Sequence, residues 1–167
     1  MTRNRLIWLA SGGSAGLLLA ALAFQYIGGL APCPLCIWQR WPHLGAALLG
    51  PVAVLLGGAL VAVLGAAVML GGAGIALYHA GVEQGWWAGP DACAAPDIGS
   101  LTPEELLAQI MAAPIVRCDE IPWEMLGLSM AAWNGIASLA LAGVWGWAAS
   151  TARFPGSRGF SEGGTRR

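Results

Sequence analysis

Apolar residues form three long runs along the chain, at 6–26, 44–78 and 126–150, and one long polar segment separates the last two. A helix needs about 20 apolar residues, at roughly 1.5 Å of rise each, to cross the hydrocarbon core of a membrane. The first and last runs each fit one such helix. The run 44–78 holds no charge and is too long for one span, so we predict that it folds back on itself.

Gly57-Gly58 is the favoured place for that turn, because the competing Gly50-Pro51 would leave the second helix too short. The tail after the last run is rich in arginine, glycine and serine, a composition typical of disorder. We therefore predict a single membrane domain over 1–150, which includes the polar loop, followed by a disordered tail. The predicted spans are 6–26, 36–56, 59–80 and 126–150, with the loop at 81–124 and the tail at 151–167.

Within the polar loop, Thr102 can cap a helix whose first position suits Pro103, and acidic residues follow. Four apolar residues would then form one face of a short helix, which ends before Pro114: Leu106, Leu107, Ile110 and Met111. We expect this amphipathic helix either to lie on the membrane surface or to pack on other loop residues.

The composition agrees with a membrane protein, since 57% of residues are apolar, 10% are charged and the mean hydropathy is +0.65. A soluble domain is usually about 25% charged. Lipid must therefore cover apolar surface that the chain cannot bury. The fold class predicted is all-α: a bundle of four transmembrane helices with a long polar loop that carries the short amphipathic helix. The chain has a net charge of −1 and no basic patch, so it offers nothing for nucleic acid.

Arginine placement sets the predicted orientation. Arg3 and Arg5 precede the first span, further arginines follow the last, and positively charged ends stay in the cytoplasm. Two cytoplasmic ends require an even number of spans, in agreement with four. The alternative for the N-terminus is a secretory signal cleaved near Ala21-Leu22-Ala23, although the apolar run is longer than a signal core of about 7–15 residues.

The tight cysteine pair, Cys33-Pro34-Leu35-Cys36, opens the second predicted helix. Helix amides and the helix dipole favour a thiolate at such an N-terminus. Cys36, Gln39, Arg40 and His43 recur at three- and four-residue steps, so they share one helix face. Arg40 could hold the Cys36 thiolate, hydrogen-bond a carbonyl ligand or reach the lipid headgroups.

The loose pair, Cys93 and Cys118, lies in the polar loop. A disulfide between them would stabilise the loop by roughly 3 kcal/mol in the chain-entropy model, and it could be only a staple. Four spans with cytoplasmic ends put both cysteine pairs on the non-cytoplasmic side, so exchange between the pairs is the favoured hypothesis. A four-cysteine zinc site is a further alternative, but its second half lacks the usual short spacing.

Two polar groups near the end of the third span, His79 and Glu83, are four residues apart. They could line a polar pocket that faces Arg40, or they could meet headgroups and water. Asn134 lies in the fourth span, where hydrogen bonding between helices is its default role.

Together these features resemble the DsbB family, the bacterial inner-membrane quinone-dependent thiol oxidases. The resemblance covers roughly 6–150. It depends on the tight cysteine pair followed by Gln39-Arg40, on the stretch from Tyr78-His79 to Cys93, and on Cys118 before the fourth span. It implies an enzyme of the inner membrane that reoxidises a DsbA-like periplasmic thioredoxin-fold protein. The electrons would pass to ubiquinone or menaquinone, and so to the respiratory chain.

The resemblance also implies a role for each site residue. Cys33 and Cys36 would face the quinone, with Cys36 as the thiolate beside the ring and Arg40 helping to bind it; Gln39 and His79 are further candidates for quinone contacts. Cys93 would form the mixed disulfide with the partner, and Cys118 would exchange with Cys33.

Two other functions are weighed against this one. A non-enzymatic channel or assembly factor would need polar residues along its spans, and the second and third spans offer almost none below Arg40. An enzyme similar to vitamin K epoxide reductase would carry its C-x-x-C on the last span, whereas here the motif comes early.

Overall fold

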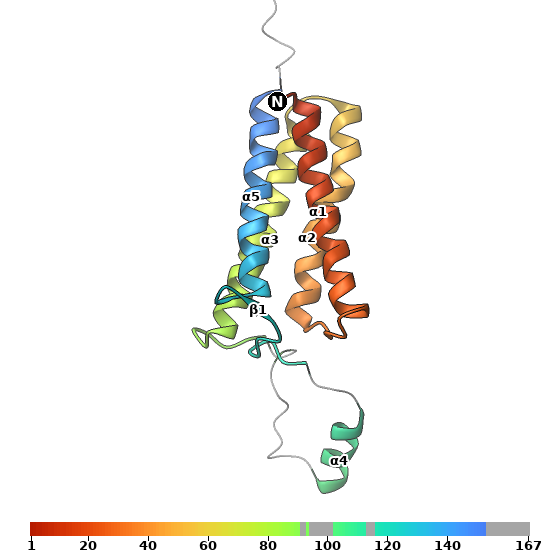
Figure 1. Ribbon diagram of the computed structural model, residues 1–167, viewed down its shortest axis with the longest axis vertical. Coiled ribbons are helices and arrows are strands. Elements are labelled where there is room, and N and C mark those ends of the chain that lie inside the picture. The colour runs from red at the N-terminus through yellow and green to blue at the C-terminus, as the bar shows by residue number, and fades with distance from the viewer. Residues whose placement is uncertain (91–92, 94–101, 113–115, 153–167) are drawn as a thin grey trace, which may run out of the picture.

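The computed structural model describes residues 1–90, 93, 102–112 and 116–152, and four long helices form a bundle within these ranges (Figure 1). These helices are α1 (Arg3–Tyr26), α2 (Pro34–Leu56), α3 (Leu60–Glu83) and α5 (Met130–Ser150). The N-terminus and the end of α5 lie at one end of the bundle, and the α1–α2 connection lies at the other. The tail expected to be disordered lies, from residue 153 on, outside the described residues.

Two glycines separate α2 from α3. Gly57 and Gly58 have φ values of +69° and +67°, a conformation that costs glycine little because it has no Cβ. The helix break therefore falls at the Gly57-Gly58 turn favoured by the sequence. Pro51, part of the competing turn, lies inside α2, and so does Pro42.

Small residues make up much of the interior of the bundle, and many large apolar residues cover its outside. The buried residues include several alanines on all four helices, among them Ala10, Ala46, Ala62 and Ala142. Leu55 and Leu77 are 83% and 62% exposed. This distribution suits helices that pack closely inside a lipid phase. By length and composition, α1 and α3 could each cross a membrane, within the part of the chain that the structure describes.

Some large side chains are buried as well, and the largest that is fully buried among the described residues is Trp145 on α5. It fits because residue 65 on α3 is glycine: a Cβ at that position would lie 2.5 Å from the Trp145 ring. The absence of a side chain at Gly65 therefore lets α3 and α5 approach closely.

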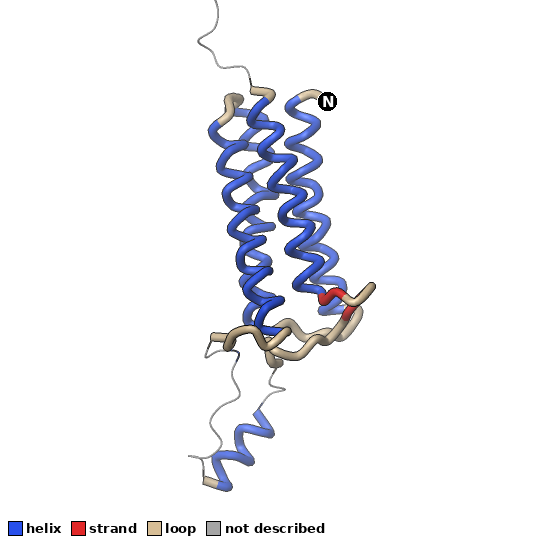
Figure 2. The backbone as a smooth tube through the Cα atoms, turned by 90° about the vertical axis from the view of Figure 1, so that its left-hand side faces the viewer, coloured by secondary structure: helices blue, strands red, loops and turns tan. Residues whose placement is uncertain are grey.

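A short hairpin precedes α5, next to the end of the bundle that holds the α1–α2 connection (Figure 2). Strands β1 (Glu124–Met125) and β2 (Leu128–Ser129) are antiparallel, and Leu126 and Gly127 between them both have positive φ. Positive φ at both central positions is the geometry of a tight hairpin turn. The fourth helix thus starts at Met130, after the start expected from the apolar run at 126.

The helix in the polar loop, α4, spans Pro103–Ala112. The backbone N–H of Glu105 donates to the Thr102 hydroxyl, and the Glu105 carboxylate accepts from the Thr102 backbone N–H at 2.9 Å. This reciprocal cap satisfies N–H groups that would otherwise lack partners. Figure 1 places α4 beyond the end of the bundle that carries the hairpin.

Candidate thiol redox site

Cys33 caps the N-terminus of α2. Its Sγ accepts a hydrogen bond from the Cys36 backbone N–H at 3.2 Å and donates its own hydrogen to the Cys36 Sγ at 2.8 Å. Both cysteines are free thiols. The hydrogen bond to Cys36, together with burial, raises the pKa of Cys33 well above its ordinary value. Cys33 therefore keeps its proton and directs it at Cys36.

The second pair, Cys93 and Cys118, forms a disulfide with its Cα atoms 5.2 Å apart. Both cysteines are buried, and they pack with Cys33, Leu35 and Val82 in one apolar cluster. Three of the four cysteines expected to exchange therefore belong to this cluster, and the fourth, Cys36, packs against its edge.

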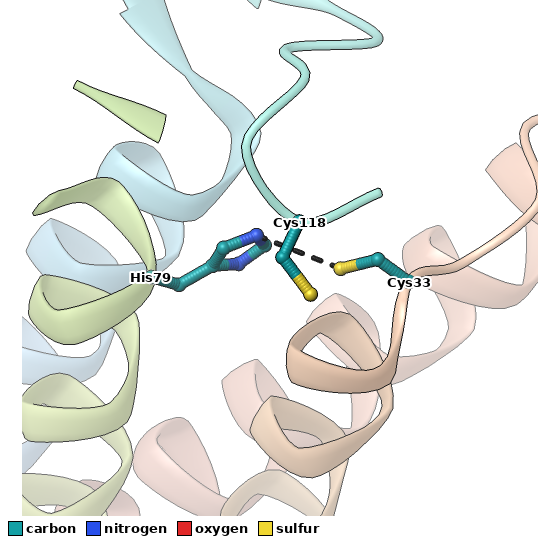
Figure 3. Close-up of side chains that lie close together, drawn as sticks. All are labelled: Cys33, His79 and Cys118. Carbon is teal, nitrogen blue, oxygen red and sulfur yellow. Dashed lines mark hydrogen bonds between the residues drawn. The ribbon is translucent and has the colours of Figure 1, made fainter. Parts of the chain in front are cut away.

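Sulfur atoms of the two pairs come close at His79. The Cys33 Sγ, a ring nitrogen of His79 and the Cys118 Sγ all lie within 4.8 Å of one another (Figure 3). Cys118 is bonded to Cys93, so its sulfur is not a free thiolate that could ligate zinc. A thiol beside a disulfide sulfur is instead the arrangement that thiol–disulfide exchange requires.

A chain of buried and half-buried polar groups leads from Cys33 across three helices. His79 Nε2 lies 3.5 Å from the Cys33 Sγ, and His79 Nδ1 lies 2.7 Å from Gln39 Nε2. Asn134 Nδ2 donates to Gln39 Oε1 at 2.6 Å, and Asn134 Oδ1 lies 2.7 Å from His43 Nε2. The predicted helix face that holds Gln39 and His43 is therefore turned inward, toward α3 and α5.

Glu83 is part of the same site. Its side chain is 2% exposed, Oε1 lies 3.8 Å from His79 Nε2, and Oε2 accepts a hydrogen bond from the Ser129 hydroxyl. Contact of His79 and Glu83 with headgroups and water, one of the two sequence-based expectations, does not match this burial. The other expectation, a pocket shared with Arg40, matches this burial, because both residues line the same cavity as Arg40.

A cavity of about 350 Å³ opens beside these groups. Cys36, Gln39, Arg40, His79 and Glu83 are among its polar lining residues. Most of its wall is apolar and includes Leu17, Leu18, Phe24, Trp123, Met130 and Trp133. Such a cavity suits an apolar ligand that carries a few hydrogen-bonding groups.

Arg40 is held in the cavity wall by a residue that sequence reasoning missed. Its Nη1 donates to Gln25 Oε1 on α1 at 2.7 Å. Ser129, which bonds to Glu83, was missed as well. A glutamine at the end of one span and a serine at the start of another give no sequence signal, because both residue types are ordinary at those places.

A helical bundle with a free dithiol next to a disulfide-bonded pair defines the class of thiol–disulfide oxidoreductases. The family described as Disulfide bond formation protein DsbB matches residues 3–148, so the chain belongs to the DsbB family. It is therefore a membrane protein and an oxidoreductase of disulfide bond formation.

Curated relatives agree with this assignment. Disulfide bond formation protein B of Stutzerimonas stutzeri is 32% identical over 142 residues, which cover 80% of this chain and 87% of the relative. Disulfide bond formation protein B 2 of Pseudomonas aeruginosa is 35% identical, and the match covers 78% of this chain and 82% of the relative. Disulfide bond formation protein B of Hahella chejuensis is 30% identical, and the match covers 89% of this chain and 94% of the relative. No solved structure matches the chain significantly.

Proposed function

We propose that this protein reoxidises a DsbA-like periplasmic thioredoxin-fold protein and passes the electrons to a membrane quinone, ubiquinone or menaquinone. Membership of the DsbB family supports this function. The single observation that carries it is the placement of Cys33 and Cys36. The Cys33 sulfur lies within 4.8 Å of the Cys118 sulfur, while Cys36 lines the apolar cavity.

In this proposal the two cysteine pairs act in sequence. The reduced partner attacks the Cys93–Cys118 disulfide at Cys93, and the resulting mixed disulfide is resolved by the partner's second thiol, which leaves Cys93 and Cys118 reduced. The Cys33–Cys36 disulfide then accepts this electron pair: Cys118 attacks Cys33, Cys36 leaves, and Cys93 displaces Cys33 from Cys118. Each step breaks one S–S bond and forms another, so the dithiol is regenerated at Cys33 and Cys36.

The cavity fits a quinone headgroup. A quinone is a flat apolar ring with two carbonyl acceptors, and the wall is apolar with polar groups gathered beside Cys36. Arg40 is a charged donor, fixed by Gln25, that would bind one carbonyl, and Gln39 and His79 would contact the ligand beside it. The quinone supplies the oxidising equivalents, and the protein supplies position and electrostatics.

The membrane topology forms part of the proposal. All four long helices would span the bacterial inner membrane with both termini in the cytoplasm, as in the four spans predicted from sequence. The hairpin, α4 and all four cysteines would lie on the periplasmic side. Leu107 and Met111 of α4 are 62% and 79% exposed, which supports contact of α4 with the membrane surface.

Replacement of Cys36 by serine tests this function. We expect C36S to abolish reduction of added quinone by the purified protein, measured by quinone absorbance with dithiothreitol as the electron donor. C93S is the matched control, because it removes only the partner-facing sulfur and should still reduce quinone with dithiothreitol. Normal quinone turnover in C36S, with the protein inserted in the membrane, would refute the role of Cys36.

A further inference from the structure

The hydrogen bonds around His79 determine which of its ring nitrogens carries the hydrogen. In a neutral histidine one nitrogen donates and the other accepts, and the partner of one fixes the role of the other. Asn134 Nδ2 donates to Gln39 Oε1 at 2.6 Å. The Gln39 oxygen is thus occupied as an acceptor, and the amide nitrogen of Gln39 faces His79 Nδ1 at 2.7 Å. His79 Nδ1 must accept, so the ring hydrogen lies on Nε2.

The surroundings of His79 Nε2 agree with this orientation. Its neighbours include the Cys33 Sγ at 3.5 Å and Glu83 Oε1 at 3.8 Å, and the ring also lies near the backbone carbonyl of Cys118; all three atoms can accept a hydrogen bond. A carboxylate is a strong acceptor for an N–H group, and the Cys33 sulfur becomes one when it is a thiolate during exchange. The groups at both ends of the His79 ring therefore favour the same tautomer.

We propose that Asn134, acting through Gln39, is a positioning residue that holds His79 as a hydrogen-bond donor to the Cys33 sulfur. This inference rests on the proposed exchange between the cysteine pairs. When Cys93 displaces Cys33 from Cys118, the Cys93–Cys118 bond forms, the Cys33–Cys118 bond breaks, and Cys33 takes the electron pair as a thiolate. A thiolate at Cys33 is costly because the site is buried and lies beside Cys36, and the His79 N–H offsets that cost.

The first test is to measure the tautomer of His79. The chain contains two histidines, and His43 Nε2 faces the Asn134 oxygen, so it also carries a hydrogen. We expect ¹⁵N NMR of histidine-labelled protein in detergent to find the Nε2–H tautomer at both residues. An Nδ1–H tautomer at one histidine of the wild-type protein, assigned to His79 with a His43→Gln variant, would overturn the proposal without any variant of Asn134.

Substitution of Asn134 by aspartate tests the coupling. Aspartate cannot donate, so the Gln39 amide should turn, present its oxygen to His79 Nδ1 and move the ring hydrogen to that nitrogen. Asn134→Asp is then expected to give one Nε2–H and one Nδ1–H histidine. Gln39→Glu should have the same effect on His79 while it keeps the Asn134 hydrogen bond, so it replaces Asn134→Asp if that variant fails to fold.

The consequence for the sulfurs is measured in a Cys36→Ser background, which leaves three cysteines and therefore one disulfide and one thiol. After acid quenching, mass spectrometry gives the ratio of the Cys33–Cys118 and Cys93–Cys118 pairings at neutral pH. Loss of the donor to Cys33 should raise this ratio about tenfold in Asn134→Asp or Gln39→Glu. Ser138→Ala is the matched control on α5, because Ser138 lies 3.5 Å from His43 Nε2 and outside the Asn134–Gln39–His79 chain.

An unchanged ratio in folded variants whose His79 tautomer has moved would contradict the proposal. Neither the spectrum nor the ratio involves a quinone, so failure of the positioning role is distinguishable from failure of the proposed quinone reduction. If the protein does not reduce quinone but gives the expected tautomer and ratio, the role of Asn134 stands and only quinone as the electron acceptor is refuted.

Discussion

At the scale of single residues, the buried polar groups lie where one cavity meets two sulfur pairs. Arg40, Gln39, His79 and Glu83 line the cavity, and His79 also contacts Cys33. Buried polar and charged groups are costly in a membrane protein unless they are paired, and each of these groups has a hydrogen-bond or ionic partner. Their pairing keeps this cost low, and the proposed ligand binding and sulfur chemistry would use the same arrangement.

Arg40 carries the most direct prediction at this scale. Arg40→Gln removes the charged donor from the cavity wall, and we expect the KM for quinone to rise about tenfold or more, the usual effect of losing a charge-assisted hydrogen bond. Exchange between the two cysteine pairs should stay unchanged. Trp41→Phe is the control, since Trp41 is 66% exposed on the outside of α2. An unaltered KM in Arg40→Gln would exclude Arg40 from the quinone site.

The spacing of the tight cysteine pair predicted much of this site. Three- and four-residue steps placed Gln39, Arg40 and His43 on one helix face, and the structure turns that face toward the cavity. The same spacing could not identify Gln25 as the partner of Arg40 or Asn134 as the partner of Gln39. Contacts between different helices depend on how those helices rotate and pack, and the sequence of one helix does not encode the partner.

At the scale of helices, the pair α3 and α5 depends on the missing side chain at Gly65. Because a Cβ there would lie 2.5 Å from the rigid, fully buried ring of Trp145, Gly65→Ala should force the helices apart. We expect a loss of about 1–3 kcal/mol in stability, measured by thermal unfolding in detergent. Gly71→Ala on the same helix meets nothing within 4 Å and should cost no stability. Equal unfolding temperatures for the two variants would show that the contact between residue 65 and Trp145 does not determine how closely α3 and α5 pack.

Helix positions were the part of the fold most open to prediction. Long apolar runs and the Gly57-Gly58 pair indicated the helices and their break, because membrane helices are specified by length and hydrophobicity. The hairpin at 124–129 was not predicted. Leu126 continues the apolar pattern of the last run, and only the positive φ values of Leu126 and Gly127 reveal a turn there.

At the scale of the whole molecule, the bundle separates two ends with different chemistry. The N-terminus and the end of α5 share one end, and the start of α2, with Cys33, lies at the other (Figure 1). The proposed electron path requires the sulfur-bearing end to face the periplasm, because disulfides persist there and a water-borne partner can reach them.

Labelling of single reporter cysteines in intact spheroplasts tests this requirement most directly. In a cysteine-free background, Leu126→Cys places a thiol at an 86% exposed hairpin position, and Thr2→Cys places one at the exposed N-terminal end. We predict that a membrane-impermeant maleimide labels the cysteine at 126 in intact spheroplasts and labels the cysteine at 2 only after lysis. Labelling at 2 before lysis, with the cysteine at 126 protected, would place the sulfur site in the cytoplasm and contradict the proposed electron path.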